Sequence, residues 1–465
     1  MPKRKAKRSK WTYGKRKKLP INLGDKGETY SEVDRISQLP DAILISILSL
    51  LSIREAARTC FLSKRWIYVW KQVTCLNFDD IDALYKPSKK IGQTTPSYKW
   101  VNQVLQLHQC PSLDAFRICS SSTYIGPSSS EIDNWIEFAM QKRVQRLEMD
   151  LEVGRLSSFS YASYIFPDKP FRSPFGVSCI KSLKHLSLSF VNITGELVEH
   201  FLSNCELLEH LCVSCSDQLV TLKVAGSSLR LKFLQISDCM CLEKIEICAP
   251  NLVSFIYHGM LGFYDSIRLR HAPLLVNVSL AESTRSIVPT FLSVKSCLPQ
   301  LVTLNLNLHM NLNMSAMVRQ PEFPELTCLK DLTLNVVASD RQSLLNLTKL
   351  IERSPFLHRF TLELRWERVP CLRNMQKVNR CPHQCLKVVK FSGFVGSSID
   401  TELAMYFTEN AVALEMFIVD LRKVVVEEST LLSEFVTTQK QLKAARKRAL
   451  QIGKKLPPGA ELIVL

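Results

Sequence analysis

The sequence predicts an α/β protein in which a short N-terminal helical unit precedes a curved solenoid of parallel strands. Two observations lead to this fold class. The pattern L-x-x-L-x-L returns at intervals of 21 to 29 residues from Leu183 to Leu414, the period of repeat proteins that stack one strand per coil. Ahead of these repeats, residues 39 to 70 space their apolar side chains as short amphipathic helices do.

Length and composition bound the class of protein. The chain has 465 residues, enough for about three domains, and its 22% of charged residues fits a folded soluble protein. The longest apolar stretch, residues 42 to 53, contains three serines and is too short to cross a bilayer. No apolar leader segment follows the basic N-terminus. We therefore expect an intracellular protein with free thiols and no membrane partner.

The first 30 residues are predicted to form a disordered basic arm. The formal net charge is +17, and residues 1 to 18 supply ten basic side chains and no acidic one, so the rest of the chain is only mildly basic. Two clusters with a short spacer match a bipartite nuclear-import signal, which predicts the nucleus and, secondarily, the cytoplasm. The alternatives are a solvated tail or a nonspecific phosphate binder. The import residues would be Lys3, Arg4, Lys5, Lys7, Arg8, Lys15, Arg16, Lys17 and Lys18.

Residues 31 to 80 form the first predicted folded unit. Pro40 suits the start of a helix of about three turns, in which apolar residues follow at helical spacing up to Leu51. Ser52 and Glu55 form a capping box for a second helix, and Ser63 can cap a third. Three short helices bury little, so the surplus apolar side chains predict either docking to another protein's helices or packing on the rest of this chain.

The residues themselves resemble a known motif. Residues 34 to 41, followed by Leu62-Ser63-Lys64-Arg65-Trp66, resemble the plant F-box over about residues 34 to 80. The resemblance implies docking to a Skp-type adaptor and, through it, to a cullin-RING ubiquitin ligase. The sequence departs from the usual F-box motif at Ser52-Ile53 and at Ile67, so the resemblance does not fix the affinity for the adaptor. The implied adaptor interface, with its immediate support, is Leu39, Pro40, Ile43, Leu44, Ile47, Leu48, Leu51, Trp66 and Trp70.

After a linker at 81 to 109, residues 110 to 368 are predicted to be leucine-rich repeats. Weaker copies begin at Leu113 and Val144, and two extra copies, from Leu219 and Leu242, predict extended segments on the convex side. Small residues, several of them cysteine, precede the strands and are predicted to let adjacent coils approach. The clearest copies begin at Leu183, Leu208, Leu231, Leu252, Leu275, Leu301, Leu329, Leu357, Leu386 and Leu414.

Strand alternation turns offsets 2, 4 and 6 of each copy onto the concave face. Most of these residues are polar and uncharged. His210 beside Phe233 could supply an aromatic anchor, and Asp331 beside Arg359 a charged one, so these four are the candidate substrate-binding residues. The alternative is that all are ordinary solvated strand positions.

Residues 369 to 450 resemble the FBD module that plants place after such repeats, with Cys381-Pro382-His383 and Gly393-Phe394 as its marks. The resemblance implies a terminal unit whose two strands continue the sheet and close the solenoid, before a tail at 451 to 465. Cys381, His383 and Cys385, like Cys212 and Cys215, lack the second ligand pair of a structural zinc site, so we expect no metal and no cofactor. The basic helix from Lys440 to Arg448 is predicted to be a solvated face.

No catalytic motif is recognisable, so we expect a protein that is not an enzyme. The favoured function is the substrate-recognition subunit of an SCF-type (Skp-cullin-F-box) E3 ubiquitin ligase. It would bind the adaptor through the F-box and an unknown protein substrate through the repeats. The alternatives are an interaction scaffold without ligase docking and, least favoured, a basic nucleic-acid-binding protein. The sequence does not reveal the substrate or any small molecule that mediates its recognition.

Overall fold

A computed structural model describes most of the chain. The described residues are 36, 38–79, 98–120, 128–152, 164–226, 228–259, 267–282, 293–309, 323–338, 343–366, 380–421 and 439–465. The basic arm, and with it every residue of the expected import signal, lies outside the described residues.

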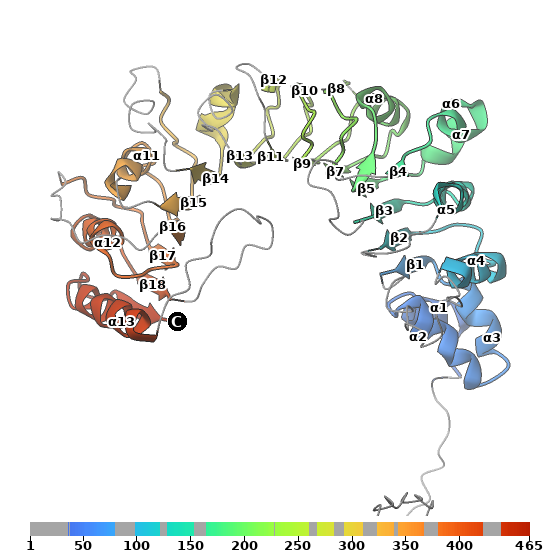
Figure 1. Cartoon of the computed structure of the whole chain (residues 1–465), viewed down its shortest axis with the longest axis horizontal. Helices are drawn as coiled ribbons and strands as arrows, with labels where there is room; N and C mark the ends of the chain where they lie inside the picture. Colours follow the sequence, from blue (N-terminus) through green and yellow to red (C-terminus); the bar gives the residue numbers. More distant parts are fainter. Residues whose placement is uncertain are drawn as a thin grey trace, which may run out of the picture.

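Parallel strands form one continuous sheet of fourteen strands along the inner side of a horseshoe (Figure 1). Every clear copy of the leucine pattern, and both weaker copies, contains one of these strands, so the predicted repeat architecture is confirmed. In sheet order they are β1 (Cys75–Phe78), β2 (Ala115–Cys119), β3 (Arg146–Asp150), β5 (His185–Ser189), β7 (His210–Ser214), β9 (Phe233–Ser237), β11 (Ser254–Gly259), β13 (Asn277–Glu282), β14 (Thr303–His309), β15 (Asp331–Ala338), β16 (Arg359–Trp366), β17 (Val388–Ser392), β18 (Met416–Asp420) and β19 (Glu461–Val464).

The outer side of the horseshoe carries helices and, where the coils are short, a second sheet (Figure 1). The two extra copies of the pattern form β8 (Thr221–Ala225) and β10 (Lys244–Cys248), as predicted, and β12 (Ile267–His271) joins them. The short strands β4 (Tyr164–Ile165) and β6 (Val191–Asn192) also pair. The helices are α4 (Tyr98–Leu107), α5 (Ser129–Gln141), α6 (Lys169–Arg172), α7 (Pro174–Ile180), α8 (Gly195–Asn204), α11 (Thr348–Glu352), α12 (Ser398–Asn410) and α13 (Gln439–Gly453), with 3-10 turns η4 (Lys295–Gln300) and η5 (Leu344–Leu347).

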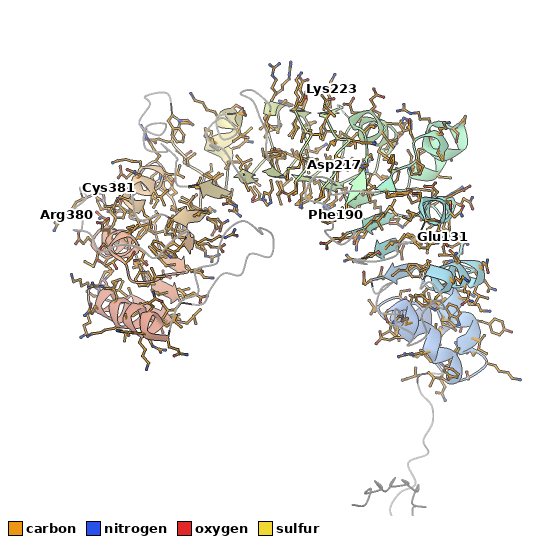
Figure 2. All side chains as sticks on the ribbon, in the orientation of Figure 1. Glu131, Phe190, Asp217, Lys223, Arg380 and Cys381 are labelled. Carbon is orange, nitrogen blue, oxygen red and sulfur yellow. The ribbon has the colours of Figure 1, made fainter. Side chains whose placement is uncertain are left out.

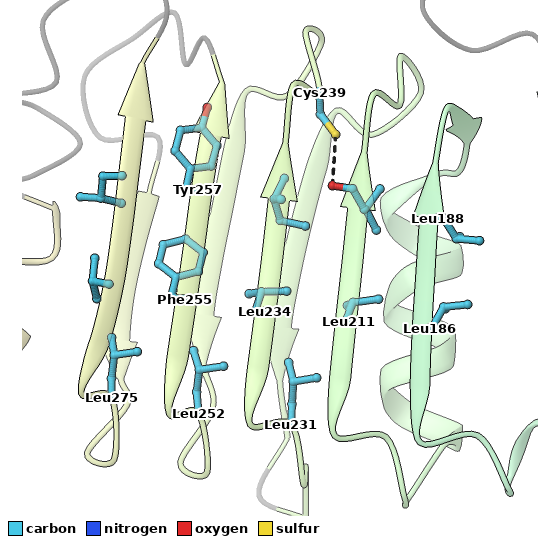
Figure 3. Packing of buried hydrophobic residues seen from close by; sticks show 14 of the residues in the cluster. Leu186, Leu188, Leu211, Leu231, Leu234, Cys239, Leu252, Phe255, Tyr257 and Leu275 are labelled. Carbon is cyan, nitrogen blue, oxygen red and sulfur yellow. Dashed lines mark hydrogen bonds between the residues drawn. The ribbon is translucent and has the colours of Figure 1, made fainter. Parts of the chain in front are cut away.

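The hydrophobic core lies between the inner sheet and the outer helices and strands, and the apolar residues of the repeat pattern form it. In one coil Leu231, Leu234 and Ile236 are all fully buried, and neighbouring coils repeat the arrangement (Figure 3). Burial of each such side chain stabilises the fold by about 1.5–3 kcal/mol. Cys239 lies in the same layer, with its thiol donating to the Val213 carbonyl at 3.9 Å. Burial raises the pKa of the Cys205 thiol to about 12, so this cysteine stays protonated and packs as a small apolar residue.

Three expectations about segment boundaries are wrong. The tail at 451–465 contains β19, which pairs in parallel with β18, so three strands and not two extend the last part of the sheet. The linker at 81–109 contains α4, whose Val101 and Val104 are buried because their helical spacing places them on the core side. The first helix, α1 (Asp41–Leu48), has eight residues instead of three turns, because the chain must leave it in time to cap the next helix at Ser52.

Candidate functional site

Three short helices form the N-terminal unit: α1, α2 (Ile53–Arg58) and α3 (Trp66–Val69), with 3-10 turns η1 (Thr59–Phe61) and η2 (Trp70–Gln72). The predicted capping box is confirmed. Ser52 Oγ accepts the Glu55 N–H at 3.3 Å. Glu55 Oε2 accepts from the Ser52 hydroxyl at 2.8 Å and from the Ser52 N–H at 3.1 Å, and these two bonds, the first most strongly, lower the pKa of the Glu55 carboxyl. The expected side-chain cap at Ser63 is wrong, because its carbonyl oxygen, not its hydroxyl, accepts from the Trp66 N–H.

The nine residues predicted for the adaptor interface divide between core and surface. Leu44, Leu48, Trp66 and Trp70 are buried and can only support a surface. Leu39 is half-buried against them, and Pro40 is exposed at the N-cap of α1. Ile43, Ile47 and Leu51 are exposed by 47%, 41% and 37%. The apolar stripe of α1 is thus wider than the core it covers, and one side of it faces solvent.

Further apolar side chains on these helices were missed from sequence. Phe61 is 89% exposed and Leu50 is 86% exposed, which is unusual for such large apolar residues in so small a unit. The available signal was the number of apolar residues, which exceeds what three short helices can bury. We name the whole set the apolar helical surface: Ile36, Ile43, Ile47, Leu50, Leu51, Phe61, Leu62, Ile67 and Tyr68.

The helical unit is joined rigidly to the solenoid. Strand β1 follows η2 directly and pairs in parallel with β2, so the unit continues into the main sheet. The Phe78 ring packs edge-on against Phe116 with centroids 5.8 Å apart. The Arg54 guanidinium lies 5.3 Å from the centroid of the Trp100 ring on α4. These contacts fix the direction in which the apolar helical surface points relative to the concave face of the sheet.

On the concave face, three rings form a ladder across β5, β7 and β9. His185 pairs in register with His210, and His210 with Phe233. The successive ring centroids are 5.4 and 5.6 Å apart, with interplanar angles of 33° and 32°. Burial lowers the pKa of His185, although Glu148 Oε1 lies 3.5 Å from its Nε2. The structure therefore brings His210 and Phe233 together as predicted. It adds His185, which the strand alternation places on this face but which was not among the four candidate residues.

The charged pair lies farther along the same face. Arg359 Nη1 is 3.6 Å from Asp331 Oδ1, and the two residues are in register on β16 and β15. Strands β11, β13 and β14 separate this pair from Phe233, so the four candidate residues form two anchors and not one site. Next to the charged pair the face carries amides, with Asn335 Nδ2 on β15 donating to Asn305 Oδ1 on β14 at 3.2 Å. This face can offer hydrogen bonds along its length and two distinct anchors.

The cysteine and histidine residues that were considered as metal ligands, Cys212 and His383 among them, lie buried or half-buried in the fold. His383 Nε2 lies 2.7 Å from the Tyr406 hydroxyl, and burial lowers the pKa of His383. Burial raises the pKa of the Cys212 thiol to about 11. Among the described residues, no three His, Cys, Asp or Glu side chains come together as metal ligands. Within the same ranges, no helix has the length and apolar character needed to cross a membrane.

A helical unit with an exposed apolar surface, fused to a curved sheet of leucine repeats, defines a class of F-box proteins with leucine-rich repeats. Comparison with known families agrees. A family model for the F-box domain matches residues 36–77, and a model described as the At1g61320/AtMIF1 LRR domain matches residues 104–465. The chain belongs to the plant F-box/FBD/LRR-repeat family.

Individual relatives come from Arabidopsis thaliana. The chain is 31% identical to F-box/LRR-repeat protein At3g03360 over 47% of this chain and 46% of that protein. It is 26% identical to FBD-associated F-box protein At5g38590 over 82% of this chain and 92% of the relative. It is 30% identical to F-box/LRR-repeat protein 25 over 47% of this chain and 83% of that protein. The match thus spans about half the length of the first of these relatives and nearly all of the second.

Proposed function

We propose that this protein is the substrate-recognition subunit of an SCF-type E3 ubiquitin ligase. The observation that carries the proposal is the apolar helical surface, because nine large apolar side chains are exposed on a unit of about 40 residues. F-box domains generally bind Skp-type adaptors, and the F-box match covers this unit. In the proposed complex the adaptor covers this surface, and the ligase core attaches through the adaptor.

The target protein would bind the concave face of the repeats. The ring ladder that ends at Phe233 supplies an apolar anchor, and Arg359 with Asp331 supplies a charged one. Strand β1 follows the helical unit directly and pairs with β2 of the sheet. A target on the concave face would therefore be held in a fixed direction from the adaptor. No chemistry by this chain is required, since the ligase core performs the transfer.

We also assign the last part of the chain to the FBD module of the family. Strands β17, β18 and β19, covered by α12 and α13, would close the solenoid as a terminal cap. Phe391 supports this role, because its ring stacks on Phe417 at 5.6 Å and packs edge-on against Phe407 at 6.1 Å. The module would then protect the end of the core and leave the concave face free for the target.

Adaptor capture tests the proposal. Purified full-length protein should retain a Skp-type adaptor, and Ile47→Asp should weaken capture by about 30-fold or more, since loss of an interface anchor typically costs 2–4 kcal/mol. Leu39→Ala with Pro40→Ala should have a similar effect. Ile165→Asp is the matched control, because Ile165 is as exposed as these residues but lies on β4. Equal capture by wild type and Ile47→Asp would leave an interaction scaffold without ligase docking as the better description.

We further propose that the basic arm directs nuclear import. Replacing residues 1–18 with an uncharged Gly/Ser segment of equal length removes ten positive charges and touches no repeat residue. A fluorescent fusion of this variant should move from the nucleus toward the cytoplasm, with an unchanged melting temperature. Retention of the variant in the nucleus would exclude this role of the arm.

A further inference from the structure

The outer side of α13 carries a dense set of positive charges. Helix α13 and the turn after it contain seven Lys and Arg residues, and residues 439–460 contain no Asp or Glu. All seven side chains are exposed, and within the described part of the chain none of them forms an ion pair. They are Lys440, Lys443, Arg446, Lys447, Arg448, Lys454 and Lys455.

The helix that carries these charges is held firmly in place. Its buried side consists of Ala445, Ala449 and Ile452, which are small enough for close packing. A Cβ added to Gly396 would lie 3.1 Å from the Ala445 Cα, so the helix nearly touches the backbone of that loop. On the side of its other neighbour, β19, a Cβ added to Gly453 would lie only 2.5 Å from Leu462 Cδ2. The backbone that carries the charges is therefore held in place and needs little ordering when a partner binds.

The cations surround the helix on every side except the buried one. Successive residues of an α-helix are about 100° apart, which places Lys440, Lys443 and Lys447 opposite the buried side. By the same spacing, Arg446 and Arg448 lie on the two flanks. Of the acidic residues of the neighbouring elements, Asp400 and Glu402 of α12 are buried. Glu409 of α12 and Glu461 of β19 are exposed, but no ion pair among the described residues joins either of them to these cations. An anionic partner could thus be contacted by the centre and both flanks at once.

The arrangement of the charges favours phosphates over carboxylates. The five cations of α13 lie on three sides of the helix, and Lys454 and Lys455 follow directly after it. An extended acidic peptide presents side chains to one face only every ~7 Å, so it would leave the cations of the far flank unmatched. Duplex DNA carries one negative charge per about 1.7 Å of helix axis, which is a much denser array. The width of the DNA major groove also admits an α-helix with phosphates on both flanks.

We propose that α13, together with Lys454 and Lys455, binds the phosphate backbone of a nucleic acid. From sequence, this basic helix was expected to be a solvated face, and nucleic acid was the least favoured partner. The structure adds that all seven cations are exposed on, or just after, one packed helix. This site lies at the opposite end of the horseshoe from the apolar helical surface (Figure 1), so it is independent of the proposed adaptor docking.

Salt-dependent binding of full-length protein to a 20-base-pair duplex of random sequence tests the proposal. Fluorescence anisotropy between 50 and 200 mM KCl gives the slope of log K against log salt. The variant Lys440→Gln, Lys443→Gln, Lys447→Gln should reduce the magnitude of this slope by about 2–3, because each lost phosphate contact removes about 0.9. Glutamine keeps a similar helix propensity, so the variant should fold normally.

A matched control removes three exposed cations elsewhere. Lys223→Gln, Lys244→Gln, Arg268→Gln changes the net charge equally, on the convex sheet, where Lys223 points outward (Figure 2). Here Glu246 already neutralises part of the charge, lying 2.8 Å from Lys244 and 4.0 Å from Arg268. The control should keep the wild-type slope. The basic arm is present in all three proteins, so its own contribution cancels.

Three outcomes would overturn the proposal. One is no duplex binding at 50 mM KCl. Another is an equal loss of slope in the two triple variants, which would show an effect of net charge alone. The third is displacement of the duplex by poly-glutamate as effectively as by unlabelled duplex at equal charge, which would indicate an acidic protein partner. Adaptor capture by the α13 variant should match wild type, so failure of this proposal is distinguishable from failure of the proposed ligase function.

Discussion

Arg65 Nε donates a hydrogen bond to Asp41 Oδ1 at 2.8 Å, although 24 positions separate the two residues. Arg65 Nη2 also donates to the Leu39 carbonyl oxygen at 2.5 Å. One guanidinium therefore ties the start of α1 to the start of α3, the two parts of the chain that carry the F-box resemblance. The exposed side chains of α1 are held in position by this link.

Loss of this link should weaken adaptor binding modestly. Because the ion pair is partly exposed, it contributes about 0.5–1 kcal/mol, so Arg65→Gln should lower adaptor affinity about two- to fivefold. Titration calorimetry measures this change. Arg58→Gln is the control, since Arg58 is an exposed arginine of α2. An affinity for Arg65→Gln equal to that of the control would show that the link does not organise the docking surface.

Two glycines with left-handed backbone should respond differently to alanine. Gly393 has φ +74°, and an added Cβ would lie 2.1 Å from the Leu364 carbonyl oxygen. Gly459 has φ +92° with no atom within 4 Å of the added Cβ. Gly393→Ala should therefore destabilise by about 3 kcal/mol or more, from strain and overlap together. Gly459→Ala should cost only about 1–2 kcal/mol. Urea unfolding compares them, and equal midpoints would contradict this account.

The stability of the C-terminal part should depend on pH through Asp400. This carboxyl is fully buried, where it accepts the Val395 and Gly396 N–H groups at 2.8 and 2.9 Å. Burial raises its pKa from 3.8 to about 6. Because the folded state holds the proton more tightly than the unfolded state, this contribution is complete below about pH 4. It is lost as pH rises through about 6, and amounts to about 3 kcal/mol.

Asp400→Asn removes the titrating group and keeps an oxygen that can accept a hydrogen bond. Between pH 4 and 7, the difference in unfolding free energy between wild type and this variant should shift against wild type as pH rises. Urea unfolding at several pH values measures it. A difference that stays constant across this range, or that shifts in favour of wild type, would refute the assigned role of Asp400.

The two concave anchors should affect target capture and nothing else. Phe233→Ala removes the last ring of the ladder, and Arg359→Glu reverses one charge of the exposed pair with Asp331. Each should weaken capture of the target protein about tenfold or more, with adaptor binding and melting temperature near wild type. Thr361→Ala, on the same face of β16, is the control. If both anchor variants capture the target fully, recognition lies on the repeat loops or the C-terminal module.

Twelve strands of the main sheet, from β2 to β18, were predictable because one buried apolar triplet specifies each of them. Strand β1 was not predicted, because it lies in the segment that resembles the F-box. Strand β19 was not predicted either, because its sequence Glu-Leu-Ile-Val carries a single leucine, and only pairing with β18 fixes it. For the candidate site, the sequence identified the residues but not which of them are exposed. Whether Leu44 or Ile43 reaches the surface depends on the rotation of α1 against α3, which tertiary packing sets. The repeat offsets placed His210 beside Phe233, but the extension of the ladder to His185 and the ring-to-ring geometry follow only from the aligned strands.

Hydrogen exchange of the full-length protein, with and without a Skp-type adaptor, tests the central claim most directly. The claim is that the exposed side chains of α1 to α3 form the adaptor-binding surface. Added adaptor should slow exchange of backbone amides between residues 41 and 72 and leave the concave strands β5 to β16 unchanged. Unchanged exchange in residues 41–72, or slowing confined to the concave strands, would contradict the assignment of this surface.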